Sequence, residues 1–271
     1  MSRGRAERFR DLEVIYRDEF LIVVNKPAGL LVHSSKLDGG EREFALQIVR
    51  NMVGKRVYLA HRLDKQTSGL LVMALDKETH AKLNNLFSNR GVSKTYVAMV
   101  RGHLLGKGCI DRPLKYQPDD LETNVPKAKL EAPQDATSLY ESLGTCVCDF
   151  AVGKFDKTGY SLVKVVPLTG RRHQIRRHLR GCGKGHPVIG DGSHGDTKQN
   201  RGARENLGLD RMMLHAYRLC FDHPVSGASL CLTAEPDESF LTILEKAGLK
   251  WDAIGASGNI VLDVSDASQD L

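Results

Sequence analysis

The sequence predicts an α+β fold in which helices flank a mixed or antiparallel sheet. Strand-like and helix-like segments follow one another irregularly, and neighbouring strands are joined by short polar turns, as in hairpins. A doubly wound parallel sheet would instead need strands and helices in regular alternation. With 271 residues, of which 41% are hydrophobic, the chain can form one large domain or two fused subdomains around a real core.

The first half of the chain contains the clearest elements. Two strands are expected in LEVIYRDEFLIVVNKPAG, residues 12–29, around a polar turn at 17–19 and before a Lys-Pro-Ala-Gly turn. Helical spacing follows in EREFALQIVRNMVG, residues 41–54, where Gly54 is a suitable end. The later elements expected in this half are a strand at 69–75, a helix at 77–90 and a strand at 93–102.

The second half begins with a segment that has no sustained period. Residues 111–137 mix Pro, Asp, Lys and Asn, and we expect an irregular insertion or a long loop there. Cys146 and Cys148 indicate a strand in which both thiols share one face. The other expected elements are a strand at 160–168, a helix at 171–181 and a closing helix at 237–248.

Composition sets the expected boundaries of the folded domain. Residues 1–11 are basic and polar and are expected to form a flexible arm. Residues 249–271 are rich in Ser, Gly and Asp and are expected to form a disordered tail. The folded domain is therefore expected over residues 12–248.

The cysteines and the N-terminus indicate a cytoplasmic protein. None of the six cysteines belongs to a C-x-x-C pair, which argues against a zinc site or a redox couple and favours reduced thiols. The longest purely apolar run near the N-terminus is residues 20–24, far shorter than the roughly 20 residues that a membrane-spanning helix needs. We therefore expect no membrane insertion.

Positive charge gathers in one segment. Lys and Arg outnumber Asp and Glu by 39 to 33, which suggests an anionic partner without deciding the matter. Residues 169–187 are strongly basic, and no carboxylate follows before Asp191. On a helix, Arg172, Arg176 and Arg180 would share one face. We interpret this stripe as a track for phosphate groups, because guanidinium groups hold phosphate oxygens in pairs; a solvated surface is the alternative.

A single aspartate lies among basic and hydroxyl side chains in AHRLDKQTSG, residues 60–69. Asp64 could cap a turn by accepting hydrogen bonds from the region of Thr67 and Ser68. Alternatively, nearby positive charge could hold it ionised, with a lowered pKa, ready to act as a nucleophile or a base. The spacing alone leaves both interpretations open.

Five motifs stand in a fixed order along the chain: NKPAGLLVH (25–33), HRLDKQTSGLLVMA (61–74), SKTYVAMVRG (93–102), TGRRHQIRRHL (169–179) and HPVIGDGSHGD (186–196). Together they resemble the RluA family of pseudouridine synthases over nearly all of residues 12–248. The resemblance implies a cofactor-free isomerase that detaches uracil from its ribose, rotates it and rejoins it through carbon. It also implies the pseudouridine synthase fold, with a central, mostly antiparallel mixed sheet flanked by helices and loops, and a catalytic cleft.

The resemblance assigns roles to individual residues. Asp64 matches the catalytic aspartate, and Arg62 matches the side chain that fills the space left by the target base. Tyr96 matches the tyrosine that stacks on the target uracil, and Arg171 matches the basic partner of the catalytic carboxylate. Flipping a base out of a helix costs a few kcal/mol, which stacking and a filling side chain offset. The order of the chemical steps at Asp64 is left open.

Further residues complete the expected RNA-binding set. His61 and Thr67 belong to the motif around Asp64, and His61 is expected to support that loop. Arg172, Arg176 and Arg180 are expected to contact phosphates without distinguishing sequence.

A cluster of His186, Asp191, His194 and Asp196 could suggest a metal site. However, it matches the H-P-x-x-G-D loop of the same family, for which no metal is implied, and it has no pattern as specific as H-E-x-x-H. We therefore expect no metal and no other cofactor. Two other classes of function stay open: a non-catalytic RNA-binding protein on the same fold, and a metal-dependent nuclease that uses this cluster.

Two segments are most similar to the TruC branch of the family, whose members modify uridine 65 of tRNA. They are residues 190–201, with His194 where relatives usually have tyrosine, and residues 209–227. Only about ten residues precede the expected domain, so the choice of RNA must come from the domain itself, its insertion at 111–137 and its tails. We expect a monomer whose partner is a tRNA, with a ribosomal RNA as the alternative substrate.

Overall fold

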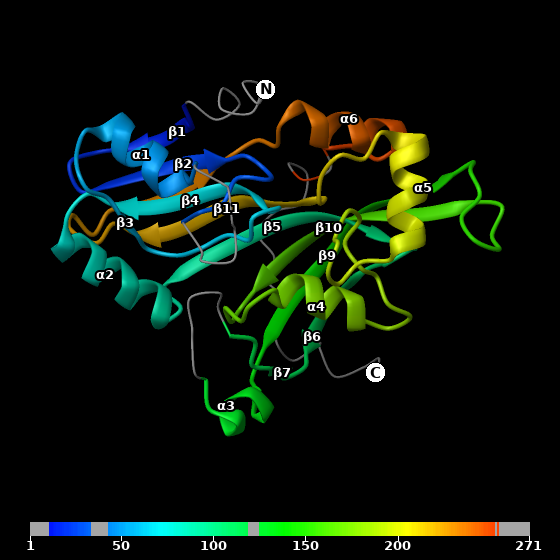
Figure 1. Ribbon diagram of the computed structural model, residues 1–271, viewed down its shortest axis with the longest axis horizontal. Coiled ribbons are helices and arrows are strands. Elements are labelled where there is room, and N and C mark those ends of the chain that lie inside the picture. The colour runs from blue at the N-terminus through cyan, green and yellow to red at the C-terminus, as the bar shows by residue number, and fades with distance from the viewer. Residues whose placement is uncertain (1–10, 34–42, 119–124, 253, 255–271) are drawn as a thin grey trace, which may run out of the picture. The chain divides into compact units, whose positions relative to one another are not determined.

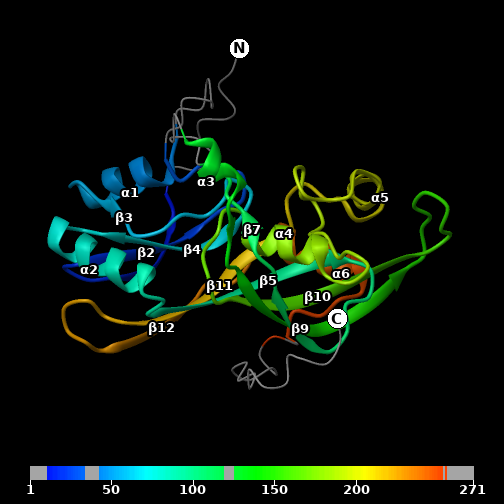
Figure 2. The same cartoon turned by 90° about the horizontal axis from the view of Figure 1, so that it is seen from below.

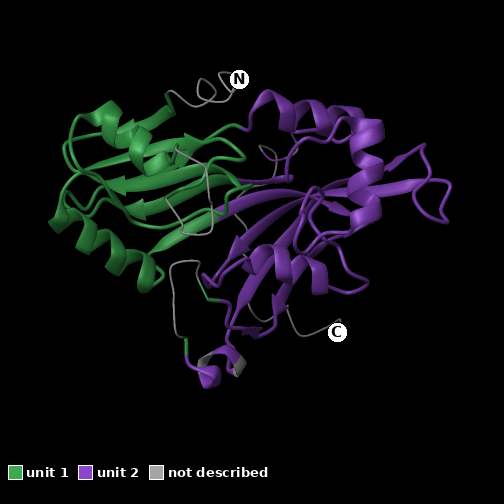
Figure 3. Ribbon diagram, viewed as in Figure 1, with its two compact units in different colours: residues 1–94, 118–125, 216–235 green, residues 95–117, 126–215, 236–271 purple. Residues whose placement is uncertain are grey.

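The structure is a computed structural model that describes residues 11–33, 43–118, 125–252 and 254. Its contacts divide the chain into two compact units (Figure 3). Unit 1 consists of residues 1–94, 118–125 and 216–235, and unit 2 consists of residues 95–117, 126–215 and 236–271.

Unit 1 contains the first strands and the first two helices. The polar turn predicted at 17–19 joins the first two strands, because the carboxylate of Asp18 accepts hydrogen bonds from the backbone N–H groups of Phe20 and Leu21. The elements are β1 (Glu13–Arg17), β2 (Leu21–Lys26), α1 (Ala45–Val53), β3 (Tyr58–Leu59), β4 (Ser68–Ala74), α2 (Lys77–Ser88) and β12 (Ser229–Thr233). Two strands, β5 (Val92–Arg101) and β11 (Leu214–Asp222), contribute residues to both units.

Unit 2 contains the longest strands and the remaining helices. They are β6 (Lys107–Asp111), β7 (Leu114–Lys115), α3 (Lys127–Glu131), β8 (Pro133–Gln134), β9 (Thr137–Cys148), β10 (Thr158–Pro167), α4 (Gln174–Gly181), α5 (Thr197–Leu207) and α6 (Glu238–Ala247). Asp196 and Asp237 cap the N-termini of α5 and α6 by accepting hydrogen bonds from backbone N–H groups of their first turns.

The strands form one large sheet and a small ribbon (Figures 1 and 2). The order in the large sheet is β1-β2-β4-β11-β5-β10-β9-β6, with β12 paired to β11 and β3 paired to β4, while β7 and β8 form the ribbon. Within each unit the pairs β1–β2, β2–β4, β3–β4, β11–β12, β5–β10, β10–β9, β9–β6 and β7–β8 are antiparallel. The predicted α+β fold with a sheet flanked by helices is confirmed.

Each unit has its own apolar core. In unit 1, α2 inserts Leu83 against apolar residues of β2, β4 and β11, including Val23, Val72 and Phe221. In unit 2, α4 inserts Ile175 and Leu179 against β5 and β10. The apolar stripes of both helices therefore face the sheet, as their sequence periods indicate.

Three sequence expectations change at the level of elements. The helix expected at 171–181 begins at Gln174, because His173 has a left-handed backbone conformation with φ 53°. The segment 111–137 is not wholly irregular, since its described residues contain β7, α3 and β8. Leu249 and Ile254 are buried, so the packed structure extends into the region expected to be a disordered tail. The rest of that tail and most of the expected arm at 1–11 lie outside the described residues.

One pair of cysteines differs from the expectation of reduced thiols. Cys220 and Cys231 lie opposite each other on β11 and β12 and form a disulfide. The sequence spacing gave no sign of this pair, because only the strand register brings the two residues together. Among the described residues, no helix has both the length and the apolar character needed to cross a bilayer.

Candidate active site

The loop that carries Asp64 joins β3 to β4 in unit 1. The backbone carbonyl of Asp64 accepts a hydrogen bond from the backbone N–H of Thr67 at 3.0 Å, which closes a tight turn. Leu63 before this turn is buried, as are Thr67 and Ser68 after it, whereas Asp64 itself is half-buried. The hydroxyl of Thr67 has no hydrogen-bond partner within the described part of the chain. A partly accessible carboxylate is therefore held on a turn that is anchored on both sides.

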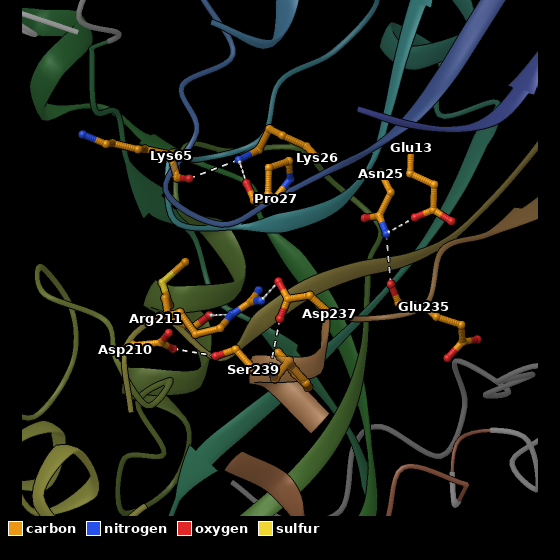
Figure 4. Close-up of polar contacts among 12 residues, drawn as sticks. Glu13, Asn25, Lys26, Pro27, Lys65, Asp210, Arg211, Glu235, Asp237 and Ser239 are labelled. Carbon is orange, nitrogen blue, oxygen red and sulfur yellow. Dashed lines mark hydrogen bonds and ion pairs between the residues drawn. The ribbon is translucent and has the colours of Figure 1, made fainter. Parts of the chain in front are cut away.

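A buried lysine fixes the same turn from the end of β2. Lys26 is fully buried, and its Nζ donates hydrogen bonds to the backbone carbonyls of Pro27 at 2.9 Å and Lys65 at 3.1 Å (Figure 4). A third hydrogen bond goes to the backbone carbonyl of Leu30 at 2.8 Å. Burying an ammonium group is costly unless its donors are satisfied, and three carbonyls satisfy this one. Lys26 therefore ties the turn after β2 to the residue that follows Asp64.

His61 holds the other end of the loop. Burial and then the nearby charge of Lys94 lower the pKa of His61 to about 3, so the ring is neutral. Its Nε2 accepts a hydrogen bond from the backbone N–H of Val72 at 3.1 Å, and its ring stacks on Phe87 with 4.6 Å between the ring centroids. His61 thus continues the β3–β4 ladder with a side chain and fixes the backbone immediately before Arg62, which is exposed.

Gly69 lets β4 pass close to β11. Its φ is 109°, a conformation that L-residues avoid, and an added Cβ would collide with the backbone carbonyl of Ala216. The glycine at the end of the motif around Asp64 is therefore required by the backbone.

Tyr96 and Arg171 lie at one end of β10 in unit 2. Tyr96, in β5, is opposite Val165 of β10 and packs against the core of this unit. β10 ends at Pro167, and Arg171 follows in the connection to α4. The Nε of Arg171 donates a hydrogen bond to the backbone carbonyl of Asp135 at 2.9 Å. The antiparallel register therefore brings Tyr96 and the loop of Arg171 to the same end of the strand.

A buried glutamine that sequence analysis missed orders the loop of Arg171. The Oε1 of Gln174 accepts hydrogen bonds from the backbone N–H of Arg171 at 2.9 Å and the hydroxyl of Thr169 at 2.8 Å. Its Nε2 donates to the carbonyl of Thr137 and the hydroxyl of Ser138, both at 3.0 Å. The sequence feature that could have indicated this role is an uncharged amide at the first turn of a helix, inside an otherwise basic run.

The residue before α4 is also held by a neighbour. The Nδ1 of His173 lies 2.8 Å from the Nε2 of His194, and the two rings meet edge to face. Burial and then the charge of Arg176 lower the pKa of His194. A positive φ costs a non-glycine residue roughly 1–3 kcal/mol, and this contact helps to hold the backbone of His173 in place.

The predicted arginine stripe is wrong at its centre. Arg176 is buried, and its Nε and Nη2 donate to the two carboxylate oxygens of Asp191, each at 2.7 Å. Burial alone would raise the pKa of Asp191, but the hydrogen bonds from Arg176 and from backbone N–H groups lower it to about 2. Arg172 precedes the first residue of α4, so only Arg180 of the three is exposed on the helix. Arg176 is therefore not available to bind phosphate.

The four residues weighed as metal ligands have other partners. Asp191 and His194 make the contacts given above. Asp196 caps α5 and forms an ion pair with Arg101 at 2.7 Å, and the Nδ1 of His186 lies 2.9 Å from the backbone carbonyl of Arg101. In the residues that the structure describes, no three His, Cys, Asp or Glu side chains are grouped to hold a metal ion. That the protein needs no metal stays a prediction.

Comparison with protein families decides the identity of the fold. The model of a family described as RNA pseudouridylate synthase matches residues 20–180, which include Asp64, Tyr96 and Arg171. The chain belongs to this family. It is an RluA-type pseudouridine synthase, as the five motifs predict, and it is therefore an isomerase that acts on RNA.

Individual relatives of this pseudouridine synthase match it over nearly its whole length. The "tRNA pseudouridine synthase C" of Yersinia pestis is 42% identical over 96% of this chain and 99% of its own length. The protein of the same name from Haemophilus influenzae is 40% identical over 90% of this chain and 100% of its own length. Among solved structures, "Human RNA Pseudouridylate Synthase Domain Containing 4" matches with a TM-score of 0.65 and 26% identity, over 88% of this chain and 94% of the human chain.

Proposed function

We propose that this pseudouridine synthase acts on tRNA and converts one uridine, at position 65, to pseudouridine in a subset of tRNAs. The observation that carries the proposal is the 42% identity to the Yersinia pestis tRNA pseudouridine synthase C, over 99% of that protein. Similarity of this extent includes the surfaces outside the catalytic motifs, and those surfaces select the RNA. The alternative substrate, a ribosomal RNA, has no comparable observation in its favour.

The reaction breaks the bond between N1 of uracil and C1′ of ribose and forms a bond between C5 and C1′. C5 loses a proton and N1 gains one, so atoms balance without an oxidant, a reductant or a cofactor. We assign the carboxylate of Asp64 to this exchange. A carboxylate can begin it by attacking C1′, by adding to the base or by abstracting a proton. The fixed turn around Asp64 supports this assignment, because a catalytic group needs an accurately held position.

The other side chains serve base flipping and orientation. In the proposal, Arg62 fills the stack that the target base leaves, Tyr96 stacks on the flipped uracil, and Arg171 pairs with Asp64. His61 holds the loop, and the buried hydroxyl of Thr67 provides a hydrogen-bonding group beside it. Arg172 and Arg180 contact RNA phosphates. Residues 12–248, together with the packed residues Leu249 and Ile254, act as one catalytic domain in a cytoplasmic monomer that uses no metal.

The test is incubation of the purified protein with separate tRNA and ribosomal RNA transcripts in the presence of EDTA, followed by mapping of pseudouridines. We expect one modified uridine, at position 65, in some tRNAs. Modification of ribosomal RNA alone would reject the tRNA assignment and leave the isomerase assignment standing. Loss of all activity in EDTA, with recovery on adding a divalent metal, would reject the absence of a metal.

A further inference from the structure

A basic pocket lies in unit 2 between α4 and the segment that follows β6. Its volume is about 410 Å³. Its polar lining residues are Arg112, Lys115, Gln117, Arg177, Arg180 and His194, and it has no carboxylate in its lining. Three of the four cations, Arg112, Lys115 and Arg180, are exposed. The pocket joins the end of α4 to the segment 111–137, which the sequence alone could not interpret.

The guanidinium groups of this pocket are held by backbone carbonyls. Arg177 donates hydrogen bonds to the carbonyl of Lys115 at 2.9 Å and to the carbonyl of Arg172 at 3.4 Å. Arg112 donates to the carbonyl of Gly181 at 3.3 Å. These bonds orient the planar groups but do not neutralise them.

The positive charge in the pocket is uncompensated. Among the described residues, Arg112, Lys115, Arg177 and Arg180 form no ion pair with a carboxylate. Burial and then the neighbouring charge of Arg112 lower the pKa of Arg177, as expected where like charges lie close together. Like charges held this close attract an anion, because a bound anion offsets their mutual repulsion.

We propose that the pocket formed by Arg112, Lys115, Arg177 and Arg180 binds a backbone phosphate of the RNA substrate. The inference rests on the proposed function only in that the substrate is an RNA. Guanidinium groups match the geometry of phosphate oxygens, and oriented groups lose little entropy on binding. Because three of the cations are exposed, the pocket can be reached from the surface. A phosphate that is linked to sugars on both sides can approach only from the surface, so it suits this pocket. The contact positions the RNA and does not distinguish its sequence.

Two variants test the pocket, one through charge and one through geometry. Lys115→Gln with Arg180→Gln removes two exposed charges from the lining. Gly181→Ala keeps every charge, but the added Cβ would collide with the guanidinium of Arg112 and displace it. Alanine is a better helix former than glycine, so the helix should be retained. The matched control is Arg204→Gln with Lys250→Gln, which removes two exposed charges that do not line the pocket.

The measurement is equilibrium binding of a tRNA transcript and of an unrelated RNA duplex over a series of salt concentrations. For both RNAs, the charge variant should bind roughly tenfold more weakly, and the slope of log affinity against log salt should flatten by roughly one unit. Gly181→Ala should weaken binding by a smaller factor. The control variant should keep the slope of the unmodified protein.

Equal slopes for the charge variant and the control would overturn the inference. A second outcome would also overturn it: equal RNA slopes together with a melting temperature that sulfate raises in the unmodified protein but not in the charge variant. The pocket would then bind small free anions and not the RNA. Pseudouridine mapping on the same samples separates the two proposals. A slope change without modification of tRNA rejects the proposed substrate alone, whereas modification without a slope change rejects the pocket alone.

Discussion

Asp64 is positioned by hydrogen bonds of the main chain around it. The turn from Asp64 to Thr67 closes on itself, and Lys26 and Gly29 both donate to the carbonyl of Lys65. Asp64 stands out in the sequence because it is a carboxylate among basic residues. The sequence places Lys26 in a turn, but it does not reveal that this lysine is buried and donates hydrogen bonds to backbone carbonyls, because such a lysine looks in the sequence like any surface lysine.

Replacing Asp64 by Asn should abolish turnover while the protein still binds RNA. The amide has the same shape but is neither a nucleophile nor a base, so we expect single-turnover rates to fall by roughly 10⁴. Binding of tRNA should change by less than about tenfold, because the phosphate contacts are intact. Single-turnover kinetics and a filter-binding assay measure the two quantities. A variant that still forms pseudouridine at a normal rate would disprove the assignment.

Replacing Gly69 by Ala should destabilise the fold. The residue would need φ near 109°, and its Cβ would collide with the backbone at Ala216. We expect a loss of about 3 kcal/mol or more and a fall in melting temperature of roughly 10 °C. Gly144→Ala is the control, because Gly144 also lies in a strand and its added Cβ meets only Leu249 at 4.0 Å. Similar melting temperatures for the two variants would contradict the argument.

At the scale of elements, α4 is joined to the loop before α5 by a buried ion pair. Arg176 and Asp191 are both almost fully buried and share two hydrogen bonds of 2.7 Å. The predicted arginine stripe was wrong here because helical spacing tells which residues share a face but not which face a neighbouring loop covers. Arg176 lies where the loop after β10 and the loop before α5 converge, and no local pattern in the sequence specifies that convergence.

Arg176→Met should destabilise the protein in a pH-dependent manner. It leaves the carboxylate of Asp191 buried without its partner, which costs about 3–5 kcal/mol at neutral pH. The pKa of Asp191 is lowered from 3.8 to about 2 in the folded protein, so the stability that its ionisation contributes is present above pH 4 and is lost as the pH falls toward 2. Urea denaturation should be measured from pH 7 to pH 3 for the unmodified protein and for Arg176→Met. The difference between their free energies of unfolding should shrink as the pH falls.

The double variant Arg176→Met, Asp191→Leu is the control for that experiment. It removes the unpaired carboxylate, so it should recover part of the stability and lose the pH dependence. If Arg176→Met lowered the free energy of unfolding by the same amount at pH 7 and at pH 3, the unpaired carboxylate of Asp191 would not be the cause.

The hairpin of β11 and β12 should resist thiol reagents at two of its positions. Cys220 and Cys231 form the disulfide, and Cys109, Cys146, Cys148 and Cys182 are free thiols. In denaturant without reductant, the protein purified in air should react at four cysteines, and after reduction at six. Titration with a chromogenic disulfide, with Cys231→Ser as the control, gives these counts. Six reactive thiols before reduction would contradict the pairing.

At the scale of the whole molecule, the sequence predicted the class of fold and the location of the catalytic motifs better than the extent of the sheet. Strands such as β2 and β4 were predictable because apolar runs end at clear turns. β11 was missed because its residues 214–222 mix His, Arg and Asp with apolar ones, and its burial comes from neighbours distant in sequence. The helix α5 was missed because it has few apolar residues and is recognised mainly by its cap, Asp196.

The two compact units should nevertheless unfold as one cooperative system, because β5 and β11 each contribute residues to both. If either strand melts, both units lose hydrogen-bonded sheet, so neither should be stable alone.

Leu83→Ala tests this: Leu83 is fully buried in unit 1, and truncating its side chain should lower the free energy of unfolding by about 2–5 kcal/mol. The single tryptophan, Trp251, belongs to unit 2 and packs against Phe240 of α6. Its fluorescence should therefore report a melting temperature lowered by roughly 5–15 °C, equal to the shift in far-ultraviolet circular dichroism. Ile243→Ala, in unit 2, is the matched control and should shift both signals together. A Trp251 transition that stays unchanged in Leu83→Ala, while circular dichroism shows an earlier melting step, would establish instead that the units unfold independently.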